Sequence, residues 1–196
     1  MMLNQIDSID DSKLIKVWDP LVRFFHWSLV LLFFIAFITE DDFLRIHSFA
    51  GYIILSLVCF RILWGFIGSR YARFSNFIYS LKNIKQFVKE ILLFKAKRYI
   101  GHNPAGGAMI ILLMSSLLIC TITGMAVYGV EQQAGPMASW FTQHTRFLAN
   151  VFEEIHEFFA NFIMFLIVIH VFGVIFESVI HKENLVKSMI TGWKSA

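Results

Sequence analysis

Charged residues are scarce in this chain. Only 16% of its 196 residues are Asp, Glu, Lys or Arg, whereas about a quarter is usual for a soluble domain. Apolar residues make up 57% of the chain and aromatic residues 16%. A membrane protein is therefore the first expectation. The formal net charge of +3 is small, so the composition does not suggest nucleic-acid binding.

Cysteine is almost absent as well. Cys59 and Cys120 are the only two, both lie in apolar runs, and the chain has no CxxC pair and no CxxCH motif. Thioether-attached haem is thereby excluded, and both thiols are expected to pack as small apolar side chains. The first residues, MMLNQIDSIDDSK, lack the basic start and apolar core of a cleavable signal peptide. Insertion would then be directed by the first spanning helix.

Four long apolar segments account for most of the chain. A membrane-spanning helix needs about 20 apolar residues, and each segment reaches that length once its flanks are included. They predict a four-helix transmembrane bundle in one membrane domain over residues 1–196, an all-α fold. The predicted spans are 20–39, 45–67, 107–130 and 152–179. Arg61 interrupts the second span, where it would snorkel to the interface or pair with an anion.

Lysine and arginine collect on one side of the predicted bundle. Because cytoplasmic loops carry an excess of these residues, the loop between the second and third spans should be cytoplasmic, and both termini with it. The expected location is the bacterial inner membrane. The loop at 69–107 contains Arg70, Arg73, Lys82, Lys85, Lys89, Lys95, Lys97 and Arg98. The opposite side contains Glu40, Asp41, Asp42, Glu131, Glu153, Glu154 and Glu157.

Apolar residues within the basic loop recur at steps of three and four. This pattern predicts an amphipathic helix lying in the cytoplasmic interface, with membrane lipid as its partner. Its lysines would face away from the apolar side. The apolar positions are Phe74, Phe77, Ile78, Leu81, Ile84, Val88, Ile91 and Leu92.

Four histidines lie near the ends of the predicted spans. His156 and His170 are fourteen residues apart on the last span, which is close to four helical turns or about 21 Å. His47 starts the second span and His26 lies early in the first. The charge-derived topology therefore places His47 and His156 near the outer face. By the same topology, His26 and His170 lie near the cytoplasmic face.

Two imidazoles at one level suit the two axial positions of a haem iron. Helix bundles supply such ligands from facing helices, so two levels predict two haem groups. With both axial positions filled, electron transfer is favoured over oxygen chemistry at the metal. Taken singly, His26 or His47 is explained equally well as an interfacial polar residue or as a haem ligand. A zinc site is not expected, because the histidines lie on both sides of the membrane and lack thiolate partners.

Further polar residues are candidates for contacts with haem propionates or a quinone. They are Arg23, Arg61, Arg73 and His102. Anchoring at the basic side explains Arg23 and Arg73 equally well, and His102 is alternatively a helix cap next to Asn103 and Pro104.

The remaining histidines and several glycines have plainer expectations. His144 is expected in solvent, and His181 as a cap or an interfacial residue. Small residues within the spans would clear space for a planar group or simply allow close helix packing. These glycines are Gly51, Gly124 and Gly173.

Several stretches resemble the bacterial cytochrome b561 family, which includes the b-type cytochrome subunit of nickel-iron hydrogenases. They cover nearly the whole chain apart from the first dozen residues and about 131–150. The stretches are KVWDPLVRFFHW from Lys16, HSFAGY from His47, FRILWGFIGSRYARF from Phe60, YIGHNPAGGAM from Tyr99, and the last span from His156 through HVFGVIFESVIHKENLVKSMITGWK.

The resemblance implies a four-helix domain with two b-type haems. The family's ligands are histidines of the first, second and fourth helices, which here are His26, His47, His156 and His170. The implied activity is electron transfer between the quinone pool and a redox partner. That partner would be a hydrogenase, a c-type cytochrome or another periplasmic oxidoreductase.

Three alternatives remain at this point. One is a stand-alone superoxide:quinone oxidoreductase of the same family. Two others, a non-redox membrane anchor and an ion transporter, would hold no haem. A transporter would be expected to carry acidic residues at mid-membrane depth. The apolar runs at 24–38, 46–67, 108–130 and 158–176 contain neither Asp nor Glu.

Overall fold

The computed structural model describes residues 14–40, 42–141 and 146–196. Four long helices account for most of them: α1 (Pro20–Ile38), α2 (Leu44–Ile67), α4 (Pro104–Glu131) and α5 (Arg146–Ile180). All four are long and apolar enough to cross a membrane. The predicted all-α fold class with four spans is confirmed. The expectations for Asp41, His144 and the first thirteen residues lie outside the described residues.

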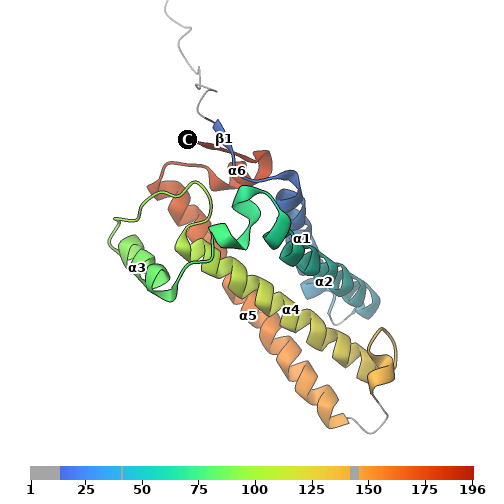
Figure 1. The fold of residues 1–196 in the computed structure, drawn as a ribbon. Coiled ribbons are helices and arrows are strands. Elements are labelled where there is room, and N and C mark those ends of the chain that lie inside the picture. The colour runs from blue at the N-terminus through green and yellow to red at the C-terminus, as the bar shows by residue number, and fades with distance from the viewer. Residues whose placement is uncertain (1–13, 41, 142–145) are drawn as a thin grey trace, which may run out of the picture.

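Shorter elements connect these helices and close one end of the bundle. They are β1 (Leu14–Lys16), 3-10 turns at Arg70–Ala72, Phe74–Asn76 and Ala138–Trp140, α3 (Leu81–Leu92), α6 (Leu185–Thr191) and β2 (Trp193–Ser195). Because β1 pairs antiparallel with β2, the two ends of the described chain lie side by side (Figure 1). Neither α6 nor this two-stranded sheet was predicted, because each is too short to show a hydropathy period.

Local sequence sets where the spanning helices begin. Asp19 caps α1 by accepting a 2.9 Å hydrogen bond from the Val22 N–H, and Pro20 occupies the first helical position. Asn103 caps α4 in the same way at 2.7 Å from the Gly106 N–H, ahead of Pro104. These caps satisfy backbone donors that the helix itself leaves unpaired.

The last helix begins at residue 146, whereas hydropathy predicts a start at 152. Its 35 residues correspond to about 52 Å, and a hydrocarbon core is only about 30 Å thick. The helix therefore continues beyond the membrane, where hydropathy no longer reports it.

A core of apolar side chains lies where the four long helices meet. The outer surface of the bundle is lined by exposed apolar residues such as Leu31, Phe49 and Phe172, as expected of helices that face lipid. The buried core consists of Phe33, Ile54, Val58, Leu117, Cys120 and Ile163.

The two ends of the bundle differ in charge. One end carries β1, α3, α6 and β2 together with the 69–103 loop, and we call it the basic end (Figure 1). The other end carries the α1–α2 and α4–α5 connections, and we call it the acidic end. Glu40, Asp42 and Glu131 belong to the acidic end. Lys82, Lys85, Lys89, Lys95 and Lys97 belong to the basic end.

The predicted amphipathic helix is shorter than its apolar pattern. Helix α3 begins only at Leu81, and Phe74 and Phe77 lie in the preceding 3-10 turn and at its end. Phe77 is not on an interfacial face, because it is 99% buried against the bundle. On α3 itself Leu81 and Leu92 are about three-quarters exposed, as an apolar face toward lipid requires.

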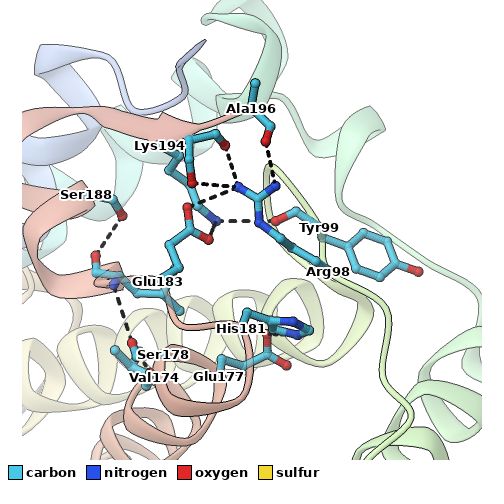
Figure 2. Close-up of polar contacts among 12 residues, drawn as sticks. Arg98, Tyr99, Val174, Glu177, Ser178, His181, Glu183, Ser188, Lys194 and Ala196 are labelled. Carbon is cyan, nitrogen blue, oxygen red and sulfur yellow. Dashed lines mark hydrogen bonds and ion pairs between the residues drawn. The ribbon is translucent and has the colours of Figure 1, made fainter. Parts of the chain in front are cut away.

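A cluster of ion pairs fastens the C-terminal segment to the basic end. Glu183 lies 3.1 Å from the buried Lys194 Nζ and 3.3 Å from an Arg98 nitrogen. The Arg98 guanidinium also donates to the backbone carbonyls of Ser195 and Ala196, and Lys194 donates to the Tyr99 carbonyl (Figure 2). The loop before α4 is thereby joined to the strand β2.

Candidate functional site

Four histidines meet in two pairs, one at each end of the bundle. At the acidic end, the ring centroids of His47 on α2 and His156 on α5 are 5.8 Å apart. At the basic end, those of His26 on α1 and His170 on α5 are 6.4 Å apart. The structure brings together the histidines that the charge-derived depths had placed at a common level.

The spacing within each pair suits a metal ion between the rings. When two imidazoles bind the same ion from opposite sides, each with a metal–nitrogen distance of about 2 Å, their ring centroids are about 6 Å apart. The observed values of 5.8 and 6.4 Å bracket that figure.

Backbone carbonyls select the tautomer of both histidines at the acidic end. The His47 Nδ1 lies 2.9 Å from the Ala36 carbonyl oxygen, and the His156 Nδ1 lies 2.8 Å from the Cys120 carbonyl oxygen. Since a carbonyl oxygen can only accept, each Nδ1 carries the hydrogen and each Nε2 keeps its lone pair. This is the usual arrangement of a metal-binding histidine. No sequence motif marks Ala36 or Cys120 as acceptors.

A cleft opens beside the acidic-end pair, and both His47 and His156 line it. Gly51 lines it, and a Cβ there would meet no atom within 4 Å, so this glycine leaves open space as expected of a site for a planar group. The remaining walls are mostly apolar and aromatic, which is typical of a cofactor site. Residues along the cleft include Phe33, Phe37, Tyr52, Met125 and Tyr128, with Glu40 at its rim.

Gly124 also lines this cleft, but it makes room for the side chain of His156. A Cβ at Gly124 would lie 2.7 Å from Cε1 and 2.9 Å from Nδ1 of His156. The glycine therefore admits the imidazole of His156, whereas the sequence suggested space for the macrocycle itself. Gly173 meets nothing within 4 Å.

Buried polar atoms without partners collect at the basic end. Among the described residues, His26 Nδ1, Arg23 Nε and Arg61 Nη1 are buried and have no hydrogen-bond partner. Arg61 is 97% buried and packs against the rings of Phe74 and Phe77 at 5.6 and 5.7 Å. Its other terminal nitrogen, Nη2, donates to the Ala72 carbonyl at 3.0 Å. A buried guanidinium with a free donor suits an anionic group.

The three candidate arginines are not equivalent. Arg23 donates through Nη1 to the Ile190 carbonyl, so it joins α1 to α6 and retains its unpartnered Nε. Arg73 is exposed, and its Nε donates to the Gly68 carbonyl at 2.7 Å. This contact closes the turn after α2, so Arg73 is the weakest of the three as an anion contact.

His102 lies between two aromatic rings at the basic end. Its ring centroid is 4.6 Å from that of Trp18 and 4.9 Å from that of Phe77, and its Nδ1 is buried with no partner among the described residues. Burial, with a further contribution from the Arg61 cation, lowers the pKa of His102 to about 3, so the ring is neutral. The cap of α4 is Asn103, and His102 remains available for another contact.

Two other residues at this end have structural roles. His181 Nε2 lies 3.4 Å from Glu177 one turn earlier on the chain (Figure 2). Asp19 was not singled out in the sequence, yet it accepts hydrogen bonds from Val22, Trp64 and Ser69. An aspartate ahead of a proline is a recognisable cap, but its link to α2 could be found only in three dimensions.

The fold and these pairs define a class: a membrane helix bundle with two facing imidazole pairs, one at each end. The chain belongs to the prokaryotic cytochrome b561 family, whose model matches residues 17–192. It is therefore a membrane b-type cytochrome, and electron transfer is the activity that membership implies. The family inferred from the sequence motifs is confirmed.

Several relatives of this chain carry similar descriptions. The chain is 27% identical to a probable Ni/Fe-hydrogenase B-type cytochrome subunit of Rhodobacter capsulatus, over 97% of this chain and 85% of the relative. It is 23% identical to the Azotobacter vinelandii subunit of the same description, over 96% and 91%. It is 28% identical to a probable Ni/Fe-hydrogenase 1 B-type cytochrome subunit of Escherichia coli K12, over 91% and 90%. No solved structure matches significantly.

Proposed function

We propose that this protein holds two haem b groups, one between each histidine pair, and passes electrons between a membrane quinone and a hydrogenase-type partner. The observation that carries the proposal is the acidic-end pair. There, two imidazoles face each other at 5.8 Å, and each has its Nδ1–H occupied by a backbone carbonyl. Bound haem would supply one-electron chemistry by cycling between ferric and ferrous iron.

The protein's own residues determine what such groups can do. His47 and His156 would hold the haem at the acidic end, and His26 and His170 would hold the haem at the basic end. Because two imidazoles would bind each iron, small molecules would be kept from it, and electron transfer would be favoured. The pairs are separated along α5 by the fourteen residues between His156 and His170.

Buried cations would hold the propionates of the basic-end haem. Arg61 is the first candidate, because its Nη1 is buried without a partner, and Arg23 the second, because of its Nε. His102 has a buried, unpartnered Nδ1 and would contact either a propionate or a quinone carbonyl. Positive charge beside a haem favours the reduced form, so these contacts would raise its potential.

The hydrogenase names of the relatives support a Ni/Fe hydrogenase as the redox partner. A hydrogenase releases two electrons and two protons from each hydrogen molecule. Two electrons, passed singly, and two protons from solvent would convert one quinone to quinol. The charge pattern supports an orientation with the acidic end on the periplasmic side of the inner membrane and both termini in the cytoplasm.

Haem content of single histidine variants tests the proposal. His170→Ala should lose one of two haem equivalents per chain in a pyridine haemochrome assay, and so should His156→Ala. His181→Ala is the matched control, because His181 is next to the end of the same helix but pairs with Glu177. Two haems retained in both ligand variants would overturn the assignment, and so would equal loss in the control.

A further inference from the structure

The carbonyls that hold the two acidic-end histidines each accept another hydrogen bond. The Cys120 oxygen accepts from His156 Nδ1 at 2.8 Å and from the Thr123 hydroxyl at 3.0 Å. The Ala36 oxygen accepts from His47 Nδ1 at 2.9 Å and is approached by the Thr39 hydroxyl at 3.4 Å. In both cases the threonine lies three residues after the carbonyl.

These donors compete for one oxygen. A carbonyl oxygen has two lone pairs, and inside an α-helix one of them already serves the N–H four residues further on. A hydroxyl that shares the oxygen withdraws electron density from it and weakens its bond to the imidazole. The hydrogen bond at Nδ1 sets how strongly Nε2 donates to a metal. The threonine hydroxyl thus acts on the metal through the histidine.

We propose that Thr123, and more weakly Thr39, are positioning residues that tune the acidic-end haem by sharing the carbonyls that hold its ligands. The inference rests on the proposed ligation by His47 and His156. Thr123 has the larger effect, because its hydroxyl is closer to the shared oxygen and lies within a regular helix. Each hydroxyl also has a nearer acceptor, the Ile119 carbonyl at 2.9 Å for Thr123 and the Ile35 carbonyl at 2.7 Å for Thr39, which is at the end of α1.

Threonine commonly bonds back to its own helix, so a matched threonine is needed as a control. Thr121 is two residues from Thr123 and bonds to the carbonyls of Leu117 and Leu118 at 2.8 and 3.1 Å. Neither of those carbonyls accepts a histidine bond among the contacts in the described chain. Thr121 therefore reports the general effect of removing a hydroxyl from α4.

The basic-end pair has no such shared carbonyl within the described residues. The His26 Nδ1 is buried without a hydrogen-bond partner there, so no carbonyl holds its N–H in the same way. A change at Thr123 should therefore affect one haem and leave the other alone. This selectivity separates ligand tuning from a general disturbance of the fold.

The experiment is a spectroscopic redox titration of the purified haem-loaded protein, with electron paramagnetic resonance of the oxidised form. In Thr123→Val the Cys120 carbonyl no longer shares its oxygen with a hydroxyl, so its hydrogen bond to His156 strengthens, the ligand becomes more basic and ferric iron is stabilised. We expect a negative shift in the midpoint potential of one haem and an altered low-spin signal from that haem. Thr123→Ser should restore both, and Thr39→Val should shift the same haem less.

Several outcomes overturn the inference. Unmoved potentials in Thr123→Val at full haem content would do so, and so would the same shift in Thr121→Val or in Thr123→Ser. If Thr123→Val does not fold, Thr123→Ala and Thr39→Val decide by the same criteria. Two haems retained in His156→Ala would overturn the proposed function itself. Haem loss in His156→Ala with unmoved potentials in Thr123→Val would overturn only the role of the threonine.

Discussion

At the level of single residues, the position of each acidic-end histidine depends on the backbone groups that contact its ring. His156 has a backbone carbonyl on its Nδ1 and a glycine against its face, both contributed by α4. The carbonyl determines the protonated nitrogen, and Gly124 determines how closely the ring approaches the helix. The Cys120 thiol also lies 3.5 Å from His156 Nδ1, but the shorter contact is with the Cys120 carbonyl, and Gly124 acts through the absence of a side chain.

Gly124→Ala should therefore displace His156. The new Cβ would lie 2.7 Å from the imidazole Cε1, which is closer than a Cβ atom approaches a non-bonded heavy atom in real structures, so the ring must move. Overpacking of this kind costs about 1–3 kcal/mol. We expect partial or complete loss of one haem equivalent, measured by pyridine haemochrome assay.

A control on the same helix is Ile122→Ala, because Ile122 is 40% exposed on the outer surface of the bundle. This variant should keep wild-type haem content. Full haem content and an unchanged spectrum in Gly124→Ala would mean that His156 does not depend on this close approach.

At the scale of elements, Asp19 joins the start of α1 to the end of α2. One carboxylate oxygen caps α1 and the other accepts from the Trp64 indole at 3.2 Å and from the Ser69 hydroxyl. Burial by itself would raise the pKa of Asp19, but the hydrogen bonds from Ser69, Val22 and Trp64 outweigh it and hold the pKa below its usual value. The carboxylate is therefore more stable in the folded protein than in the unfolded chain.

Asp19→Ala should lower the free energy of unfolding by about 2 kcal/mol, because the helix loses its cap and two donors lose their acceptor. Thermal unfolding in detergent, followed by circular dichroism, measures this. Asp19→Asn keeps a side-chain oxygen as a cap and should lose less. Equal losses in the two variants would contradict the capping role.

The same residue predicts a pH dependence. Since the folded pKa of Asp19 is lowered, its contribution is fully present above the unfolded pKa and is lost as pH falls through the folded value. Acidification below about pH 4 should therefore reduce the stability of the wild type more than that of Asp19→Asn. Parallel stability curves for the two proteins at acid pH would show that Asp19 does not contribute in this way.

At the scale of the whole molecule, charge divides the bundle into two ends. The basic end gathers the lysines of α3 and the 69–103 loop, the buried Arg61 and the ion-pair cluster around Glu183. The acidic end gathers carboxylates at the α1–α2 and α4–α5 connections. This division supports an orientation of the bundle in the membrane and a direction of electron flow between the two ends. A haem near the arginines would hold an electron more firmly than a haem near the carboxylates.

Reporter fusions test the orientation. Alkaline phosphatase, which is active only after export, should be inactive when fused after Ala196 and active when fused within 132–136. A fluorescent protein that folds only in the cytoplasm should give the reverse result. Phosphatase activity at the C-terminal fusion would place the basic end outside and overturn the charge-derived topology.

The membrane class, the four spans and the identities of the paired histidines could be predicted from the sequence alone. They follow from hydropathy and from histidine position along each span, and both are properties of contiguous residues. The family followed from the resemblance of the sequence motifs. The pairing at a common level also followed, because topology converts position along a helix into depth. The short elements α6 and the two strands show no period long enough to read, and the apolar period before α3 was misleading because Phe74 lies in a 3-10 turn.

Which groups surround each histidine could be learned only from how the helices pack. Cys120 and His156 are 36 residues apart in the chain, and their contact exists because α4 and α5 pack together. A carbonyl oxygen is present at every residue, so the residue type does not indicate which carbonyl binds an imidazole. The separate roles of Arg61 and Arg73, and the use of Gly124 by His156, have the same origin. They depend on which surfaces of distant segments meet, and hydropathy along one helix carries no information about that.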